Sequence, residues 1–400
     1  MLDSIYIAAS GLSTHQGGLK VISSNVANMN SPGYKGLRNQ FTDVFLRTGT
    51  ETGQQQADSG SGVDSLPPMI DFRSGELRET GRDLDAALDG PGFFVVQDLQ
   101  GNRFYTKTGR FELNSEDKLV TLAEGYEILG ASIDSSAQPI DLSSLRLSAY
   151  RPTTKISLSG NLSGTAGNAN SAQPDHTIDE VKVYDAMGAE RKLQLQFEVA
   201  DDAGSLIAGK WNIKVLEDGK EISTATIEVP SFPDGSEAPR FSITLAALDG
   251  QSSTIDVSLE GVTGYSMGTT STLAAKTVDG NAAGTLSKAA IDASGAIQIT
   301  YTNGQTATGP KLAVAEFASP EVLTRKSGAM FTYSGPTPVR FVSLGDGTKL
   351  KTASVELSNV DLTDQFSTMI LIQRGFQASS QVLSTANEMI QALYDLRSRR

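Results

Sequence analysis

Residues 1–29, MLDSIYIAASGLSTHQGGLKVISSNVANM, carry an apolar heptad repeat with the spacing of a long amphipathic helix. Residues 361–396 carry the same kind of repeat at the other end of the chain. Matching ends predict that the two termini come together, with each other or with neighbouring subunits. We therefore expect a self-assembling structural protein rather than a free enzyme. The apolar seam positions are Leu2, Ile5, Ala9, Leu12, Leu19 and Val26 in the first repeat, and Leu362, Met369, Ile372, Phe376, Leu383, Ala386, Ile390 and Leu393 in the second.

The flanks of both repeats contain helix-boundary signals. Residues 32–33, Pro-Gly, should end the first helix, and either Asp361 or Thr363 could cap the second. Four glycines inside the repeats weaken isolated helices, each by about 1 kcal/mol relative to alanine. We expect poorly ordered ends until they pack against partners; two core helices of one globular domain are the alternative. These glycines are Gly11, Gly17, Gly18 and Gly375.

Charge is distributed unevenly along the chain. The net charge is −13 over 400 residues, and the acids and bases of residues 1–30 and of residues 360–400 cancel. The whole negative excess therefore lies in residues 31–359, so neutral ends suit close packing and the acidic middle suits a solvated exterior. No basic stripe indicates nucleic-acid binding. Absence of cysteine excludes disulfides and thiolate sites, and no apolar run is long enough for a transmembrane helix.

The middle of the chain has the alternating pattern of β-strands rather than a helical period. Residues 31–70 are polar and glycine-rich around positions 49–63, and we expect an extended linker there. Residues 71–149 with 286–360 predict an inner β-domain, and residues 150–285 an outer β-domain inserted into it. Asp218-Gly219 predicts a hairpin turn, and Asn303-Gly304 predicts a type I′ turn. The fold expected is mixed and mainly β: two nested β-domains carried on long N- and C-terminal coiled-coil-type helices.

Chemistry-bearing residues are scarce. The sequence has two histidines, His15 and His176, which we interpret as a surface residue of the first helix and a solvated turn residue. No HExxH, GxSxG or GxxxxGK[ST] motif occurs. Paired acids such as Asp83 and Asp85 lie near turn residues, where aspartate commonly bonds locally. We therefore assign no catalytic, cofactor-binding or metal site.

Four segments resemble one family, the bacterial flagellar axial proteins of the rod and hook. Residues 23–35, SSNVANMNSPGYK, are similar to its N-terminal signature S-x-N-[IV]-A-N-x-x-T-x-G-[FY]-K, with Ser31-Pro32 as a minor departure. Further similar segments are residues 75–85 with 92–94, residues 105–111, and residues 357–376. Three segments of the middle resemble the hook members in particular: residues 183–188 (VYDAMG), 301–306 (YTNGQT) and 317–323 (FASPEVL).

The resemblance implies a helical tube that joins rod to filament and transmits motor torque while bending. It assigns Asn25 and Asn28 to assembly beside the seam residues. It also implies as partners the chain itself, a rod protein, a hook–filament junction protein, a hook cap, a hook-length-control protein and the flagellar type III export apparatus. Because the first residues do not resemble a secretory signal peptide, we expect export to the cell surface without cleavage. The alternatives are a distal rod protein of the same family and a secreted adhesin or hydrolase with coiled-coil ends.

Overall fold

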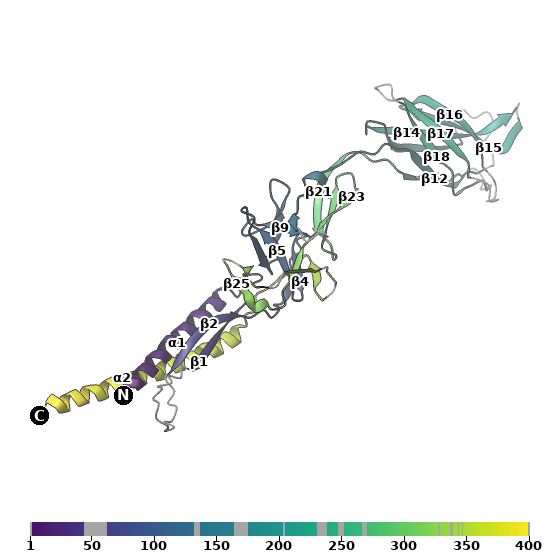
Figure 1. Ribbon diagram of the computed structural model, residues 1–400. Coiled ribbons are helices and arrows are strands. Elements are labelled where there is room, and N and C mark those ends of the chain that lie inside the picture. The colour runs from purple at the N-terminus through teal and green to yellow at the C-terminus, as the bar shows by residue number, and fades with distance from the viewer. Residues whose placement is uncertain are drawn as a thin grey trace. The chain divides into compact units, whose positions relative to one another are not determined.

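The computed structural model contains two compact units, and the chain passes between them more than once. The first unit holds residues 1–144, 289–299 and 308–400, and the second holds residues 145–288 and 300–307. The expected mainly β fold with one helix at each end is confirmed (Figure 1). The structure describes residues 2–43, 62–131, 137–163, 175–202, 205–229, 238–246, 252–265, 270–326, 329–336, 339–342, 344–345 and 347–398.

The α-helices among the described residues of the first unit are α1 (Leu2–Ala27) and α2 (Leu362–Ser398). α1 ends five residues before Pro32, as the Pro-Gly signal predicts. Asp361 is the residue that caps α2, because its Oδ1 accepts hydrogen bonds from the backbone N–H groups of Thr363 (2.7 Å) and Asp364 (3.3 Å). Among the described helices, none combines the length and apolarity needed to cross a membrane.

A two-stranded antiparallel ribbon, β1 (Leu37–Asp43) and β2 (Val63–Ile70), lies along α1 (Figure 1). Thr14 donates its hydroxyl to the carbonyl of Val63, and the Asn39 amide donates to the carbonyl of Gly18. These bonds tie the ribbon to one side of the helix. The segment predicted to be an extended linker thus contributes two paired strands, while most of its glycine-rich part lies outside the described residues.

The rest of the first unit is built mainly on one ten-stranded antiparallel sheet. Its central path runs β25-β26-β6-β5-β9-β8-β7, with β10 on β9 and with β24 between β5 and β27. In two further pairs, β28 pairs with β4 and β29 with β3. They bring residues 349–356 against residues 77–89. The strands are β3 (Leu77–Glu79), β4 (Ala86–Asp89), β5 (Phe93–Gln97), β6 (Arg103–Thr106), β7 (Phe111–Leu113), β8 (Leu119–Thr121), β9 (Glu127–Gly130), β10 (Gln138–Pro139), β24 (Val314–Glu316), β25 (Leu323–Arg325), β26 (Met330–Tyr333), β27 (Arg340–Val342), β28 (Lys349–Thr352) and β29 (Ser354–Glu356).

Aromatic side chains fill the core of this sheet. Phe93 contacts Phe72, Phe317 and Phe331 edge to face, with ring centroids 5.5 to 5.9 Å apart. Edge-to-face contacts complement the ring quadrupoles and add to the burial of apolar area. Strand β5 therefore contributes Phe93 and Val95 to the core of this sheet.

A four-stranded sheet has the order β11-β21-β22-β23, with bounds Leu147–Ser148, Gly284–Ile291, Ala296–Tyr301 and Thr306–Lys311. The type I′ turn predicted at Asn303-Gly304 is wrong. Tyr301 N–H donates to Gln305 O, Gly304 N–H donates to Tyr301 O, and only Gly304 has a positive φ, at 78°. A type I′ turn needs positive φ at both central residues, so this is a three-residue turn with one left-handed glycine.

Within the described residues of the second unit, two sheets pack around one apolar core. One sheet has the order β13-β14-β15-β16, and the other has the order β17-β18-β12-β19 with β20 on β12. Trp211 of β15 lies in the shared core at 1 % exposure. At Asp218-Gly219 both φ angles are positive, so the predicted hairpin turn is confirmed. The strands are β12 (Lys155–Asn161), β13 (His176–Tyr184), β14 (Glu190–Asp202), β15 (Ser205–Glu217), β16 (Lys220–Glu228), β17 (Arg240–Ala246), β18 (Ser252–Ser258), β19 (Val262–Thr263) and β20 (Ala274–Val278).

Both histidine interpretations are wrong. His176 begins strand β13, and its Nε2 lies 2.8 Å from the carbonyl oxygen of Leu273. His15 is half-buried, and its ring packs on Gly375 of α2 with Nδ1 inaccessible. Glycine at position 375 leaves the space that the imidazole occupies, and that space cannot be deduced from the helical period alone.

Candidate assembly site

The terminal helices pack against each other in an antiparallel register. Gly11 faces Ser379, Gly18 faces Ile372, and Asn25 faces Gln365, so both helices advance by seven residues between contacts. A Cβ added at Gly11 would lie 2.8 Å from Ser379 Oγ, and one added at Gly18 would lie 2.7 Å from Ile372 Cδ1. The glycines therefore permit a close approach of the two helices.

The face that α1 turns to α2 is one residue out of step with the predicted seam. The contacts of α1 lie at Gly11, His15, Gly18 and Asn25, with buried Ile22 between them, whereas the predicted positions follow one residue later. Glycine, histidine and asparagine pack closely but add no apolar residue to the heptad pattern. The apolar residues beside them therefore set the predicted seam. Of the predicted residues, Ile5, Leu12, Leu19 and Val26 are half-buried, and the side chain of Leu2 lies outside the described part of the structure.

On α2 the predicted seam coincides with the covered face. Ile372 and Ala386 are buried, at 5 % and 2 % exposure. Phe376 and Leu393 are exposed, because position 375 rather than 376 meets α1 and because Leu393 lies beyond the end of α1. The remaining predicted residues are half-buried: Leu362, Met369, Leu383 and Ile390.

Asn25 joins both helices to the ribbon. Its Nδ2 donates to Leu37 O (2.8 Å) and to Gln365 Oε1 (2.9 Å), and its Oδ1 accepts from Leu37 N–H (2.8 Å). This side chain is 2 % exposed, so each bond replaces one that water would otherwise make. Asn28 has a local role, donating to Ser24 O (2.9 Å) in the last turn of α1.

A buried ion pair holds the two connecting segments of the chain together. Lys35 Nζ lies 2.6 Å from Glu356 Oε1, with side-chain exposures of 1 % and 0 %. Lys35 also donates to Arg73 O, and Glu356 Oε1 also accepts from Gly75 N–H. Burying two charges is costly unless both are paired and bonded, and removing one partner leaves the other uncompensated. The pair therefore ties the segment after α1 to strand β29, shortly before α2.

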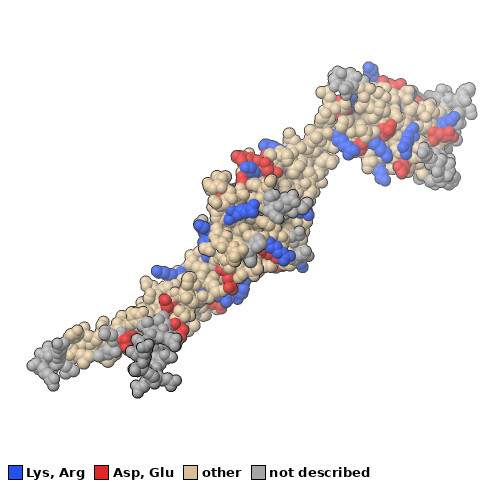
Figure 2. Space-filling model, in the orientation of Figure 1, with Lys and Arg blue, Asp and Glu red and all other residues tan. Residues whose placement is uncertain are grey.

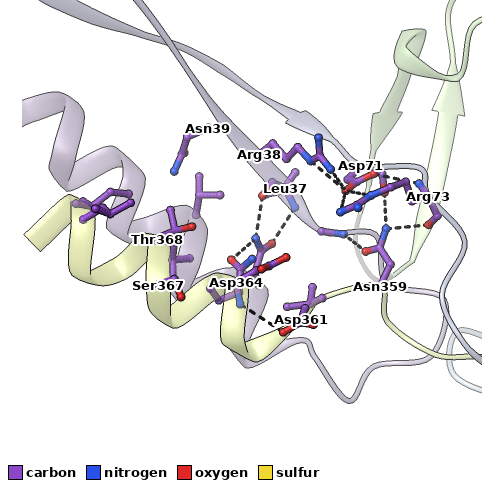
Figure 3. Close-up of a pocket in the computed structure, with 18 of the residues that line it drawn as sticks. Leu37, Arg38, Asn39, Asp71, Arg73, Asn359, Asp361, Asp364, Ser367 and Thr368 are labelled. Carbon is purple, nitrogen blue, oxygen red and sulfur yellow. Dashed lines mark hydrogen bonds and ion pairs between the residues drawn. The ribbon is translucent and has the colours of Figure 1, made fainter.

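Asn359 completes this connection from the other side. Its Oδ1 accepts from Gly36 N–H, and its Nδ2 donates to the carbonyls of Asp71 and Arg73, each at 2.8 Å (Figure 3). Partial burial opposes ionisation of Asp71, but bonds from Arg73 and the charge of Arg38 hold the pKa of this carboxyl below its ordinary value.

A groove of about 640 Å³ opens where these groups meet, and we call it the helix–ribbon groove. Its floor includes Val21 and Ile22 of α1, and its walls include Phe41 of β1 and Leu371 of α2. Arg38, Asp71, Arg73, Asp361 and Asp364 line its rim (Figure 3). Among the described residues no group of His, Asp or Glu side chains could hold a metal ion.

Sequence patterns missed Lys35, Glu356 and Asn359 as site residues. A signal was available, since Glu356 is the lone charged residue in the run of residues 353–360. Lys35 likewise stands between Tyr34 and Gly36 at the end of the signature segment. A lone charge in a segment without other charges is a candidate for a buried, paired group.

The fold and the site define a class: a protein whose two distant termini fold into one helical unit that carries β-domains. Three family models match parts of the chain, namely the Flagella basal body rod protein at residues 5–35, the Flagellar hook protein FlgE/F/G D1 domain at 87–163, and the Flagellar basal body rod FlgEFG protein C-terminal at 351–396.

Full-length comparison narrows this class. The chain is 28% identical to the "Flagellar hook protein FlgE" of Treponema pallidum (99% of this chain, 100% of that one), 27% to that of Escherichia coli K12 (98% and 99%), and 26% to that of Rhizobium meliloti (97% of each). A solved flagellar hook protein of Helicobacter pylori, FlgE2, aligns with a TM-score of 0.43 at 12% identity over 70% of this chain and 99% of that one. These matches support a structural subunit of the flagellar hook, which is a part of the bacterial flagellum.

Proposed function

We propose that the chain polymerises through its terminal helices into a flexible helical tube, which couples rod to filament and transmits torque as a universal joint. The observation that supports this most directly is the apolar surface left on the helices. Phe366, Ile370 and Leu371 of α2 are 50 to 70 % exposed, as are Tyr6 of α1 and Tyr394 of α2. A soluble chain does not normally leave so many large apolar side chains on one helix pair in water.

Charge distribution supports the same proposal. The visible face of the helix pair carries few charged side chains compared with the β-sheets of either unit (Figure 2). Because the predicted seam of α1 is only half-covered within the chain, Ile5, Leu12, Leu19 and Val26 remain available to neighbouring copies. Repeated contacts between unlike surfaces generate an open helical polymer rather than a closed ring when the rotation does not close.

The nested domain scheme is also part of the proposal. Residues 1–30 with 361–400 would form the assembly domain, residues 31–70 its extended connection, residues 71–149 with 286–360 the inner β-domain, and residues 150–285 the inserted outer β-domain. The chain enters the second unit at residue 145 and leaves its main part at residue 288, which supports the insertion. Pairing of Leu147 with Thr285 supports adjacent entry and exit strands.

The predicted partners follow from this role. They are further copies, a rod protein and a hook–filament junction protein at the two ends, and a cap and a length-control protein during assembly. Export through the flagellar type III apparatus without signal cleavage would place the polymer outside the cell. A distal rod protein of the same family is the second candidate, because two family models carry rod names. The nearly full-length relatives cited above are all named as hook proteins, so the rod alternative is not better supported.

Removal of residues 361–400 tests the polymerisation mechanism. Electron microscopy of the purified full-length chain should show tubes, and the truncated chain should show none. Tubes formed without residues 361–400 would contradict assembly through the terminal helices. A chain lacking residues 150–285 is the matched control, since it should still form tubes. If that chain also supports normal swimming and normal hook curvature, the proposed bending role of the insertion is wrong.

A further inference from the structure

Among the residues that the structure describes, no helix packs on the last turns of α2. Continuing the observed register places Leu2 opposite Glu388, so residues 389–398 extend past α1 by about 15 Å. We call this segment the α2 overhang. Met389, Leu393 and Tyr394 are 47, 50 and 67 % exposed on it. Large apolar side chains exposed together on a helix end indicate a surface that another molecule covers.

The helix–ribbon groove lies at the opposite end of the helix pair. It follows α2 from Asp361 to Ile372, a length of about 16 Å. Its walls present unfilled apolar surface, since Phe41 is 48 % and Leu371 is 70 % exposed. The groove and the overhang therefore match in length and in apolar character.

We propose that the helix–ribbon groove receives the α2 overhang of a second copy of the chain. This inference rests on the proposed polymerisation and identifies which surfaces meet. Each copy has one groove and one overhang, at opposite ends of the same helix pair. The contact is therefore heterologous, and it adds copies head to tail. One end of the growing polymer keeps a free groove, and the other end keeps a free overhang.

Charge favours the same occupant. Asp361 and Asp364 are exposed at the groove rim, and Asp71 there is already engaged by Arg38 and Arg73. Three arginines follow Asp395, at positions 397, 399 and 400. Bringing this basic end to the rim acids adds favourable electrostatic interaction, which fixes the direction of entry more than it adds affinity.

Site-directed cross-linking of the full chain tests the contact. Because the sequence contains no cysteine, Phe41→Cys and Leu393→Cys each introduce a single thiol. The two variants, carrying different affinity tags, are mixed and treated with a short bis-maleimide. The expected product is the mixed dimer, with neither variant giving a comparable dimer alone. Tyr6→Cys, at 58 % exposure on α1, replaces Leu393→Cys in the control mixture and should not cross-link to Phe41→Cys.

A substitution in the groove gives an independent measurement. Leu371→Glu should raise the critical concentration for polymerisation roughly tenfold or more. The proposed contact would bury Leu371 against the neighbouring copy, and the substitution would place a charge there instead. Leu99→Glu is the matched control, since Leu99 is 86 % exposed on a turn of the inner sheet, and it should leave the critical concentration unchanged.

The outcomes separate this inference from the proposed function. Normal tubes without the mixed dimer, or with equal cross-linking in the control mixture, would overturn the groove–overhang contact and leave polymerisation intact. Failure of the unmodified chain to polymerise would overturn the proposed function. The mixture still tests the groove in that case, because two soluble chains at high concentration can form the dimer without a polymer.

Discussion

Lys107 is a lysine whose ammonium group is buried within the first unit. Its Nζ donates to Gly90 O (2.7 Å) and lies 4.8 Å from the centroid of the Phe93 ring. Burial lowers the pKa of this ammonium from 10.5 to about 8, with nearby Glu356 opposing the shift and Lys35 adding to it. The first unit therefore contains a cation that is destabilised by desolvation.

This lysine should make stability rise with pH between about 8 and 10.5. In that window the unfolded chain binds the proton and the folded chain has released it, so raising the pH favours folding. The full effect is on the order of 3 kcal/mol. Unfolding free energies of the unmodified chain and of Lys107→Met, measured by urea titration from pH 8 to 10, should differ by an amount that depends on pH.

Lys118→Met is the control for this titration. Lys118 is a half-buried lysine. Hydrogen bonds from its ammonium to Glu127 and Glu116 raise its pKa. Its contribution to stability is lost only above its ordinary pKa, so the control should not change the slope below pH 10. A slope that is the same with and without Lys107 would show that its ammonium is not destabilised in the folded chain.

Ala353 stores backbone strain between β28 and β29. Its φ is +48°, a left-handed conformation that costs a residue with a Cβ roughly 1–2 kcal/mol. Its carbonyl accepts the N–H of Thr80 at 2.8 Å, which holds the conformation in place. Ala353→Gly should therefore raise the melting temperature in calorimetry, whereas Ala315→Gly in buried β24 should lower it. Equal destabilisation by both substitutions would contradict the strain.

Residue-scale contacts show where sequence patterns stop being informative. The Asp98, Asp185 and Asp292 turns repeat one arrangement, in which the carboxylate accepts the N–H four residues later, and such turns are predictable from local sequence. Lys35 and Glu356 are 321 positions apart, and no local pattern relates them. Their pairing depends on the three-dimensional closure of the chain.

At the scale of elements, the two helices illustrate two kinds of packing. The α2 face was predictable because it is apolar at heptad spacing. The α1 face was misplaced by one residue because Gly11, Gly18 and Asn25 contribute close approach and hydrogen bonds rather than apolar area. Counting apolar residues at heptad spacing selects the larger apolar side chains beside that face. The structure leaves these side chains only half-buried.

Two adjacent glycines separate helix propensity from helix packing. A Cβ at Gly17 would meet only Ser65 Oγ at 3.8 Å, whereas one at Gly18 would lie 2.7 Å from Ile372 Cδ1 and 3.2 Å from Asn39 Nδ2. Gly17→Ala should stabilise α1 by about 1 kcal/mol through propensity alone. Gly18→Ala should gain less or become destabilising, because Ile372 must move. Thermal melting followed by circular dichroism at the helical band measures both; equal stabilisation would mean that the helices do not approach closely at Gly18.

At the scale of the whole molecule, the two units have separate cores and separate natural probes. The only tryptophan, Trp211, is buried in the second unit, and both long helices belong to the first. The core of the second unit is built from residues between 156 and 273, which form one continuous stretch of the sequence. A continuous segment with its own apolar core is expected to fold as a cooperative unit.

Tryptophan fluorescence and helical circular dichroism should therefore report different unfolding transitions in the monomeric full-length chain. The helical signal should be lost at lower denaturant, because the isolated helix pair exposes apolar surface that only neighbouring copies would cover. Residues 150–285 produced alone should keep the fluorescence transition of the full chain. A single coincident transition in the full chain, together with an unfolded 150–285 fragment, would show that the second core depends on the first. An outer domain with that dependence could not be the separable insertion that the proposed bending role requires.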